Sequence, residues 1–311
     1  MKKYRNLLFG LGLFVAGGVV GALVMKSVSA SDADREPVTQ VRQSGYNFIS
    51  PLLDCDPSSS ASVPGSVKQS ISQSINEIMK RGTIEFVSIY YRDLNNGPWF
   101  GVNEKEEFAP ASLLKVPVMM TILKQAERDP AILDEVIENA ATGQSESVRQ
   151  LIERMIIASA NDALDQLNLV MEFSELEDLH KVLGISYPRV DSPENYLTVK
   201  EYASLFRVLY NASYLNREMS EYALELLSRA TYAQGLVAGV PESVVVSHKY
   251  GAQSGVLASR QQHHDCGIVY HPEQPYLICV MTKGGEYEQL ISAVSSVSES
   301  VYNAVEKTTN N

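Results

Sequence analysis

The chain has 311 residues, of which 45% are hydrophobic, and a formal net charge of -11 at pH 7. This length and apolar content are sufficient for one large globular core, or for one catalytic domain together with a membrane element. The negative net charge argues against nucleic acid or anionic lipid as the main partner, because the electrostatic field of the protein has the wrong sign.

The N-terminal residues have the pattern of a membrane-targeting segment. Three cationic side chains lie among the first five residues, and an uncharged stretch follows. At about 1.5 Å per residue, residues 7–25 reach about 28 Å, which is enough to span a hydrocarbon core. We therefore expect a cytoplasmic basic start at 1–6 and a transmembrane anchor at 7–25, with the rest of the chain outside the cytoplasm. The alternative is a signal peptide cleaved after Ala30, which would make the protein secreted.

Residues 26–45 are polar and have neither a helical nor a strand period, so we expect a tether that joins the anchor to a catalytic domain at 46–311. Within that domain, the sequence predicts a helix over 67–81. Its isoleucines recur at helical spacing, and Gly82 follows at the position where helices commonly end.

The remaining elements alternate in type along the chain. Two strands are predicted over 86–94 and 99–102, joined by the turn signal Asn95-Asn96-Gly97. Helical spacing of apolar residues follows over 148–157, 163–171, 175–183 and 199–210. Strand patterns return over 244–248, 266–270 and 276–282, and a last helix is predicted over 287–305. This order predicts an α+β fold, with an antiparallel sheet built from both chain ends, helices on its faces and an inserted helical subdomain.

Three short motifs occur in order: Ser112-Leu113-Leu114-Lys115, Ser159-Ala160-Asn161 and Lys249-Tyr250-Gly251. Taken singly, such residues are typical of a helix cap, a polar loop and a solvated strand. A serine hydroxyl is a weak nucleophile that needs a base within hydrogen-bond reach, and one helical turn would bring Lys115 next to Ser112. Burial beside a second cation such as Lys249 would keep the Lys115 amine partly neutral. The motifs together therefore predict acylation of Ser112, with the helix N-terminus at that serine directed at the developing oxyanion.

The order and spacing of the motifs resemble those of the penicillin-recognising serine hydrolases, most closely the class A β-lactamase catalytic domain. The resemblance runs from about Asn47 to the C-terminus and includes His264-Asp265-Cys266-Gly267 after the third motif. It implies a β-lactamase/transpeptidase-like fold. It also implies that Ser159 passes a proton to the leaving nitrogen while Lys249 holds that serine electrostatically. Asn161 would orient Lys115 and bind the substrate's amide, and the N–H of Ala252, just past Gly251, would be the second oxyanion donor.

Two departures from the family pattern bear on activity. The family's Glu-x-x-Leu-Asn string, whose glutamate activates the deacylating water, is absent from 184–198. Only Asp191 and Glu194 are carboxylic candidates there, and we expect Glu194 to be a surface turn residue. Tyr250 stands where the family has a threonine or serine that grips the substrate carboxylate, so the site is expected to prefer a different acyl donor. Gln253 and Ser254 are either a replacement for the lost hydrogen bond or ordinary polar residues of an edge strand.

The remaining polar residues suggest no metal or cofactor. His263, His264 and Asp265 form a short polar run where the family fold begins a strand, so we do not expect a metal site. Three cysteines, Cys55, Cys266 and Cys279, allow at most one internal disulfide. The last two lie on adjacent predicted strands, and we favour packing of unlinked side chains there, with a disulfide between them as the alternative that the sequence leaves open. Asp162 is expected to cap the helix that follows it. No Gly-x-Ser-x-Gly string, phosphate loop or dinucleotide fingerprint occurs.

The leading hypothesis is a serine hydrolase of the class A β-lactamase type that acylates Ser112 with a β-lactam or a related amide and hydrolyses the adduct. Because the glutamate string is missing, one alternative is a D,D-peptidase that acts on the D-alanyl peptides of the cell wall. A second alternative is a non-enzymatic sensor ectodomain for β-lactams or cell-wall fragments. The sequence does not determine the oligomeric state.

Overall fold

The computed structural model describes residues 40–55, 62–95, 97–139, 142–188, 194–254 and 261–309. Its central element is a five-stranded sheet in the order β4-β3-β11-β10-β9, with all neighbouring strands antiparallel. The strands are β3 (Phe86–Asp93), β4 (Trp99–Val102), β9 (Val246–Gln253), β10 (Gln262–Val269) and β11 (Tyr276–Lys283). Two strands come from the first third of the chain and three from the last, so the predicted α+β fold with a sheet built from both chain ends is confirmed.

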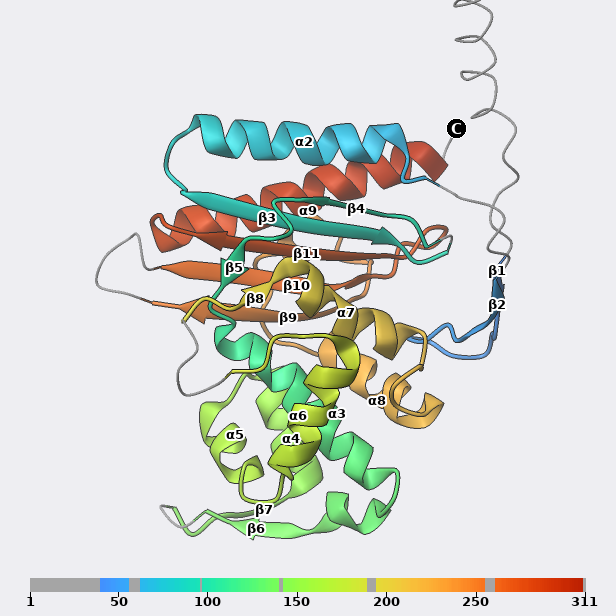
Figure 1. The fold of residues 1–311 in the computed structure, drawn as a ribbon, viewed down its shortest axis with the longest axis vertical. Coiled ribbons are helices and arrows are strands. Elements are labelled where there is room, and N and C mark those ends of the chain that lie inside the picture. The colour runs from blue at the N-terminus through green and yellow to red at the C-terminus, as the bar shows by residue number, and fades with distance from the viewer. Residues whose placement is uncertain are drawn as a thin grey trace, which may run out of the picture. The chain divides into compact units, whose positions relative to one another are not determined.

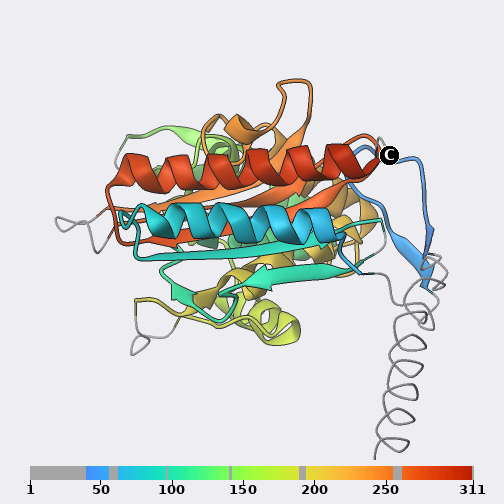
Figure 2. The same cartoon turned by 90° about the horizontal axis from the view of Figure 1, so that it is seen from above.

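Helices α2 (Gly65–Lys80) and α9 (Tyr287–Thr309) lie side by side on one face of the sheet (Figures 1 and 2). Their apolar stripes and the facing strand residues form one buried core. Ile71 and Val297 from the two helices, together with Ile278 from β11, are fully buried in it. The isoleucine spacing that predicts α2 is therefore the spacing of the side chains that meet the sheet.

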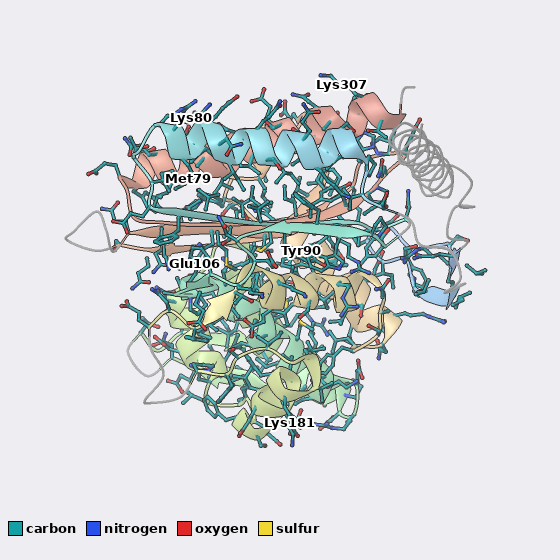
Figure 3. All side chains as sticks on the ribbon, turned by 45° about the horizontal axis from the view of Figure 1, so that its top comes forward. Met79, Lys80, Tyr90, Glu106, Lys181 and Lys307 are labelled. Carbon is teal, nitrogen blue, oxygen red and sulfur yellow. A yellow bond between two sulfur atoms is a disulfide. The ribbon has the colours of Figure 1, made fainter. Side chains whose placement is uncertain are left out.

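The other face of the sheet carries the helical subdomain, which the chain inserts between β4 and β9 (Figure 1). In Figure 3, Lys80 and Lys181 lie on the outer sides of the two helical layers and Tyr90 lies between them. The helices are α3 (Lys115–Ala126), α4 (Val148–Ile157), α5 (Asn161–Leu167), α6 (Phe173–Leu183), α7 (Val199–Tyr210) and α8 (Arg217–Ser228). Two short strand pairs link the loops: β5 (Glu107–Phe108) with β8 (Leu197–Thr198), and β6 (Val136–Glu138) with β7 (Ser145–Ser147).

The strands of the third motif extend beyond their predicted limits. The strand predicted over 244–248 runs to Gln253, so Lys249, Tyr250 and Gly251 all belong to β9. Strand β10 begins at Gln262, four residues before its apolar pattern starts. The intervening residues are polar but buried, and each of them has a hydrogen-bond partner. The polar first half of β10 therefore could not be predicted as a strand from hydropathy.

The end of the expected tether is part of the folded domain. Strand β1 (Gln40–Arg42) pairs with β2 (Leu52–Cys55), and Arg42 Nη1 donates to Ser50 O at 2.6 Å and Asn211 Oδ1 at 3.0 Å. A three-residue strand is too short to show a period, so this part of the 26–45 prediction is wrong. The expected anchor at 7–25 lies outside the described residues. Among those that are described, no helix has the length and apolarity needed to span a bilayer.

The prediction that Cys266 and Cys279 pack without a covalent link is wrong, because the structure joins them in a disulfide. The antiparallel register of β10 and β11 places the two residues directly opposite each other. The sequence indicates adjacent strands but not their register, and the register decides whether two cysteines meet. The side chain of Cys55 lies outside the described part of the structure.

Candidate active site

Ser112 lies in a short 3-10 turn, Ala111–Leu114, rather than at the first residue of an α-helix, because α3 begins at Lys115. Ala111, just before the serine, has a φ of 47°, a left-handed conformation that residues with a side chain adopt at a cost. The fully buried Tyr202 donates its hydroxyl to the carbonyl of Leu113 at 3.1 Å. The turn that presents Ser112 is thus held by a helix of the subdomain.

Strand β10 holds the chain just before this turn. Ala109 N donates to Gln262 Oε1 and Ala109 O is bonded by His264 Nε2, both at 3.0 Å. Burial lowers the pKa of His264 to about 3, so the ring is neutral at pH 7. Since a carbonyl only accepts, Nε2 must carry the proton. These positioning roles, and that of Tyr202, were not predicted from the sequence. The alternation of Gln262 and His264 along the strand was the available signal.

Lys115 is buried, with 1% of its surface exposed, and its ammonium group reaches the second motif. Nζ donates to Ser159 O at 2.5 Å and to Asn161 Oδ1 at 2.6 Å, and it lies 3.3 Å from Ser159 Oγ. Burial lowers the pKa of Lys115 below its ordinary value, since leaving water disfavours the charged form. Asn161 is exposed, so its side-chain N–H groups are accessible from the solvent side.

Ser159 lies between two lysines. Its hydroxyl oxygen accepts from Lys249 Nζ at 2.9 Å and lies 3.3 Å from Lys115 Nζ. The residue has a φ of 54°, in the bend that joins α4 to α5. Burial, and then the charge of Lys115, lowers the pKa of Lys249 to about 7. At neutral pH the cluster therefore contains a lysine that both gains and loses a proton readily.

Gly251 packs directly against the turn that carries Ser112. A Cβ atom at this position would lie 2.7 Å from Pro110 O and 2.8 Å from Leu113 Cγ. Only glycine lets the edge strand approach the turn this closely, and this contact brings the first and third motifs together. Ala252 is the next residue on the same edge strand and is half-buried. Its role as an oxyanion donor stays a prediction.

The side chain of Tyr250 packs at the edge of the sheet. Its ring stacks on that of Tyr232, with the centroids 3.9 Å apart and the planes inclined by 20°. Lys249 Nζ lies 4.4 Å from the centroid of the Tyr250 ring. The tyrosine is therefore part of an aromatic stack next to Lys249, where a small hydroxyl side chain was the family expectation.

Within the described part of the chain, no carboxylate is hydrogen-bonded to the residues of the first motif. Among the described residues, neither Ser112 Oγ nor Lys115 Nζ has a hydrogen bond to a carboxylate, and Ser112 Oγ has none at all. Glu194 is exposed, as expected of a surface turn residue, and accepts from Gln253. Asp162 is not the N-cap residue of α5, which is Ala160, so the prediction is wrong in the position of the cap. Asp162 lies in the first turn and accepts from Arg154 Nη2 at 2.7 Å; this bond, with smaller contributions from backbone N–H groups of the turn, lowers the pKa of Asp162.

The family model described as "Beta-lactamase enzyme family" matches residues 70–305. The chain belongs to this family. The fold is also that of several solved structures. PBP-A is 19% identical, with 80% of this chain and 99% of that chain covered and a TM-score of 0.68. A representative class A β-lactamase from Bacteroides cellulosilyticus is 20% identical, with 78% and 99% covered and a TM-score of 0.68. No curated protein matches the sequence significantly.

A third relative is the β-lactamase from Sphaerobacter thermophilus, which is 18% identical, with 76% of this chain and 96% of that chain covered and a TM-score of 0.68. As a member of the β-lactamase family, the protein is a serine hydrolase-like enzyme. Sequence identities of this size show a shared fold but not a shared substrate.

The two buried lysines make the stability of this β-lactamase family member depend on pH. The folded pKa of Lys249, about 7, is far below that of the unfolded chain, near 10.4. Between these values the unfolded state binds the extra proton, so the free energy of unfolding rises with pH, by at most about 1.4 kcal/mol per pH unit. Lys249→Met should therefore stabilise the protein most at pH 7 and below, and the gain should shrink as pH rises to 9.5.

Urea unfolding curves at several pH values measure this difference. Lys181→Met, on the exposed surface of α6, is the matched control and should track the wild type at every pH (Figure 3). A constant difference between Lys249→Met and the wild type from pH 6 to 9.5 would contradict the assignment of a lowered pKa to Lys249.

Proposed function

We propose that this protein is a serine hydrolase of the class A β-lactamase type that acylates Ser112 with a β-lactam or a related amide and then hydrolyses the adduct. The observation that carries the proposal is the position of Ser159 Oγ, which is 2.9 Å from Lys249 Nζ and 3.3 Å from Lys115 Nζ. Two lysines converging on one hydroxyl form a proton-transfer cluster next to the turn of Ser112. A lysine exposed to solvent, or a serine that caps a helix, would not be expected to make these contacts.

In the proposed reaction, neutral Lys115 takes the proton of Ser112 as Oγ attacks the carbonyl carbon. The carbon–nitrogen bond then breaks and the acyl group stays on Oγ. Ser159 gives its proton to the leaving nitrogen and recovers one from Lys249 or Lys115. Water then attacks the acyl-serine and releases the acid. The lowered pKa values of both lysines support this sequence, since each lysine must exist in both protonation states.

A D,D-peptidase that uses the same site on D-alanyl peptides is the second candidate. The observation that favours it is that, among the described residues, no carboxylate is hydrogen-bonded to Lys115 or Ser112. An acyl-enzyme without such a base is expected to hydrolyse a β-lactam adduct slowly. One structural relative, 20% identical, is a leucine-to-glutamate mutant of PBP-A described as an acyl-enzyme complex with penicillin G. That description supports the use of penicillin G as a covalent probe of this site.

Intact-mass kinetics with penicillin G test the proposal. A mass increase of one penicillin per chain is the expected result for both candidate enzymes, and a wild-type protein that is never labelled would exclude both. A short-lived adduct with multiple turnover identifies a β-lactamase, whereas a lasting adduct together with D-alanine release from muropeptides identifies the peptidase. A lasting adduct without turnover of any acyl substrate would instead identify the sensor.

We also propose that the catalytic domain lies outside the cytoplasm, held by a single membrane anchor at 7–25 or secreted after cleavage behind Ala30. The cationic start and the uncharged stretch after it support this location. Fractionation of expressing cells, followed by the mass of the mature N-terminus, separates the two cases. Recovery of the full-length chain in the cytosol would contradict both.

A further inference from the structure

The two faces of strand β9 have different surroundings. In the register with β10, Lys249 lies opposite Cys266 and Gly251 opposite His264, whereas Tyr250 lies opposite Asp265 and Ala252 opposite His263. Successive side chains on a strand point to opposite faces. Lys249 and Gly251 therefore face the helical subdomain and the turn of Ser112, while Tyr250 belongs to the face covered by α9.

Four side chains on that second face form an aromatic wall, which we define as Tyr232, Tyr250, His263 and Tyr287. The ring of Tyr232 stacks on Tyr250, and its hydroxyl lies 3.2 Å from His263 Nε2. The Tyr287 hydroxyl lies 3.4 Å from His263 Nδ1, with the two rings edge to face. The histidine is fully buried and the three tyrosines are partly exposed. The parts of the wall that solvent can reach therefore belong to the tyrosines.

The aromatic wall carries no positive charge at neutral pH. Burial lowers the pKa of His263 to about 4, and burial raises the pKa of Tyr232 and of Tyr287. The imidazole and both hydroxyls are therefore neutral. Behind them lies the fully buried Asp265, whose carboxylate accepts from Leu236 N and is bonded to His248 Nδ1, both at 2.9 Å. Among the described residues, the one cation in ring contact with the wall is Lys249.

A carboxylate placed against this wall would lose water without gaining a full ion pair. Its only described cationic neighbour would be a lysine that is largely neutral above pH 7, and the charge of Asp265 would repel it. Leaving a desolvated charge poorly paired is costly. A flat uncharged group, by contrast, packs on phenol rings and can bond to their hydroxyls.

The aromatic wall adjoins the leaving-group side of the scissile bond. Lys249 Nζ bonds to Ser159 Oγ, the proposed proton donor to the leaving atom, and the same Nζ lies 4.4 Å from the Tyr250 ring centroid. In the proposed reaction, the departing part of the substrate would therefore lie beside Tyr250.

We propose that the aromatic wall is a leaving-group subsite that selects acyl donors whose leaving group is uncharged, such as a carboxamide or an aryl group, over donors whose leaving group carries a carboxylate. The proposal rests on the proposed acylation of Ser112. One consequence is that penicillin, with a carboxylate next to its leaving nitrogen, acylates the serine more slowly than a neutral donor of similar intrinsic reactivity. The preferred substrate is then an amide or ester without a free carboxylate beside the bond that breaks.

Two thioesters that share a phenylacetylglycyl acyl group test the preference, one with thioglycolic acid and the other with thioglycolamide as the leaving group. Acyl-Ser112 formation is followed by intact mass, and each rate is divided by the rate of hydroxide hydrolysis of the same donor. On this corrected scale, the wild type should react with the amide donor about 10-fold faster, which corresponds to about 1.4 kcal/mol. Tyr250→Phe keeps the ring and should keep this ratio.

Tyr250→Arg adds a cation at the partly exposed position and should reverse the ratio. Tyr302→Arg, on the far part of α9 beside His271, adds the same charge outside the wall and should leave the ratio unchanged. Equal corrected rates in the wild type, or a faster carboxylate donor, would overturn the leaving-group preference while leaving the proposed function intact. A chain that neither donor acylates at Ser112 would instead overturn the proposed function, and the preference with it.

Discussion

Ser112→Ala is expected to abolish covalent labelling by penicillin G and by any other acyl donor. The adduct consists of a bond to Ser112 Oγ, and the other serine hydroxyl of the site, Ser159 Oγ, already bonds to two lysines. Intact-mass spectra after a saturating incubation should show the unmodified variant alone. The free energy of unfolding should change by less than about 0.5 kcal/mol, because Ser112 is partly exposed and its Oγ has no hydrogen bond within the described part of the chain.

The matched control is Ser72→Ala on α2, an exposed serine whose hydroxyl donates to Lys68 O of its own helix. It lies on the opposite side of the sheet and should be labelled at the wild-type rate. A Ser112→Ala protein that still gains the mass of one penicillin would show that the nucleophile is elsewhere. Peptide mapping would then examine Ser159 first.

Lys115→Met should lower the rate of acyl-enzyme formation by about 10²- to 10⁴-fold, the usual contribution of a general base. The methionine fills a similar volume, and the change removes a buried amine whose pKa is already lowered by burial, so the fold should persist. The rate is measured under single-turnover conditions, with samples quenched at set times and analysed by intact mass. Thermal unfolding of the same samples checks the fold.

Two further variants separate a base from a fixed charge. Lys115→Arg keeps a positive charge but remains protonated at all accessible pH values, so it should be as slow as Lys115→Met if the amine acts as a base. Lys124→Met, on the same helix, removes an ammonium that bonds to Glu127 and Tyr214 O, and acylation should be unaffected. A Lys115→Arg protein with near-normal acylation would show that the lysine acts through charge alone.

Much of the fold was open to prediction from local patterns. The isoleucine spacing of α2, the turn after Asp93 and the apolar run of β11 were each recognisable, because core contacts repeat with the period of the element. Local patterns failed where polar residues are buried. His263, His264 and Asp265 have the composition of a loop, yet they lie within β10, because each finds a hydrogen-bond partner in the interior.

The site divides in the same way. The motif residues and their types were readable because the chemistry requires a serine, a lysine and an amide at short, fixed spacings. The residues that position them were not readable, because their contacts cross the fold. Gln262 bonds to Ala109 from 153 residues away, and Lys249 bonds to Ser159 from 90. A pattern that repeats over a few residues cannot reveal contacts between residues so far apart in the sequence. The disulfide between Cys266 and Cys279 was equally hidden, because it depends on the register of two strands.

By itself, the sequence determined the order of elements, the sheet built from both chain ends and the identity of the three motifs. Local propensity and the requirements of acyl chemistry act over a few residues, so these features are visible in the chain. Only the tertiary structure decided that Ser159 lies between Lys115 and Lys249, that Gly251 touches the turn of Ser112, and that Tyr250 joins an uncharged aromatic wall. These contacts join residues that are far apart in the sequence. They, and the burial that shifts the pKa values of the lysines, arise only when distant segments pack together.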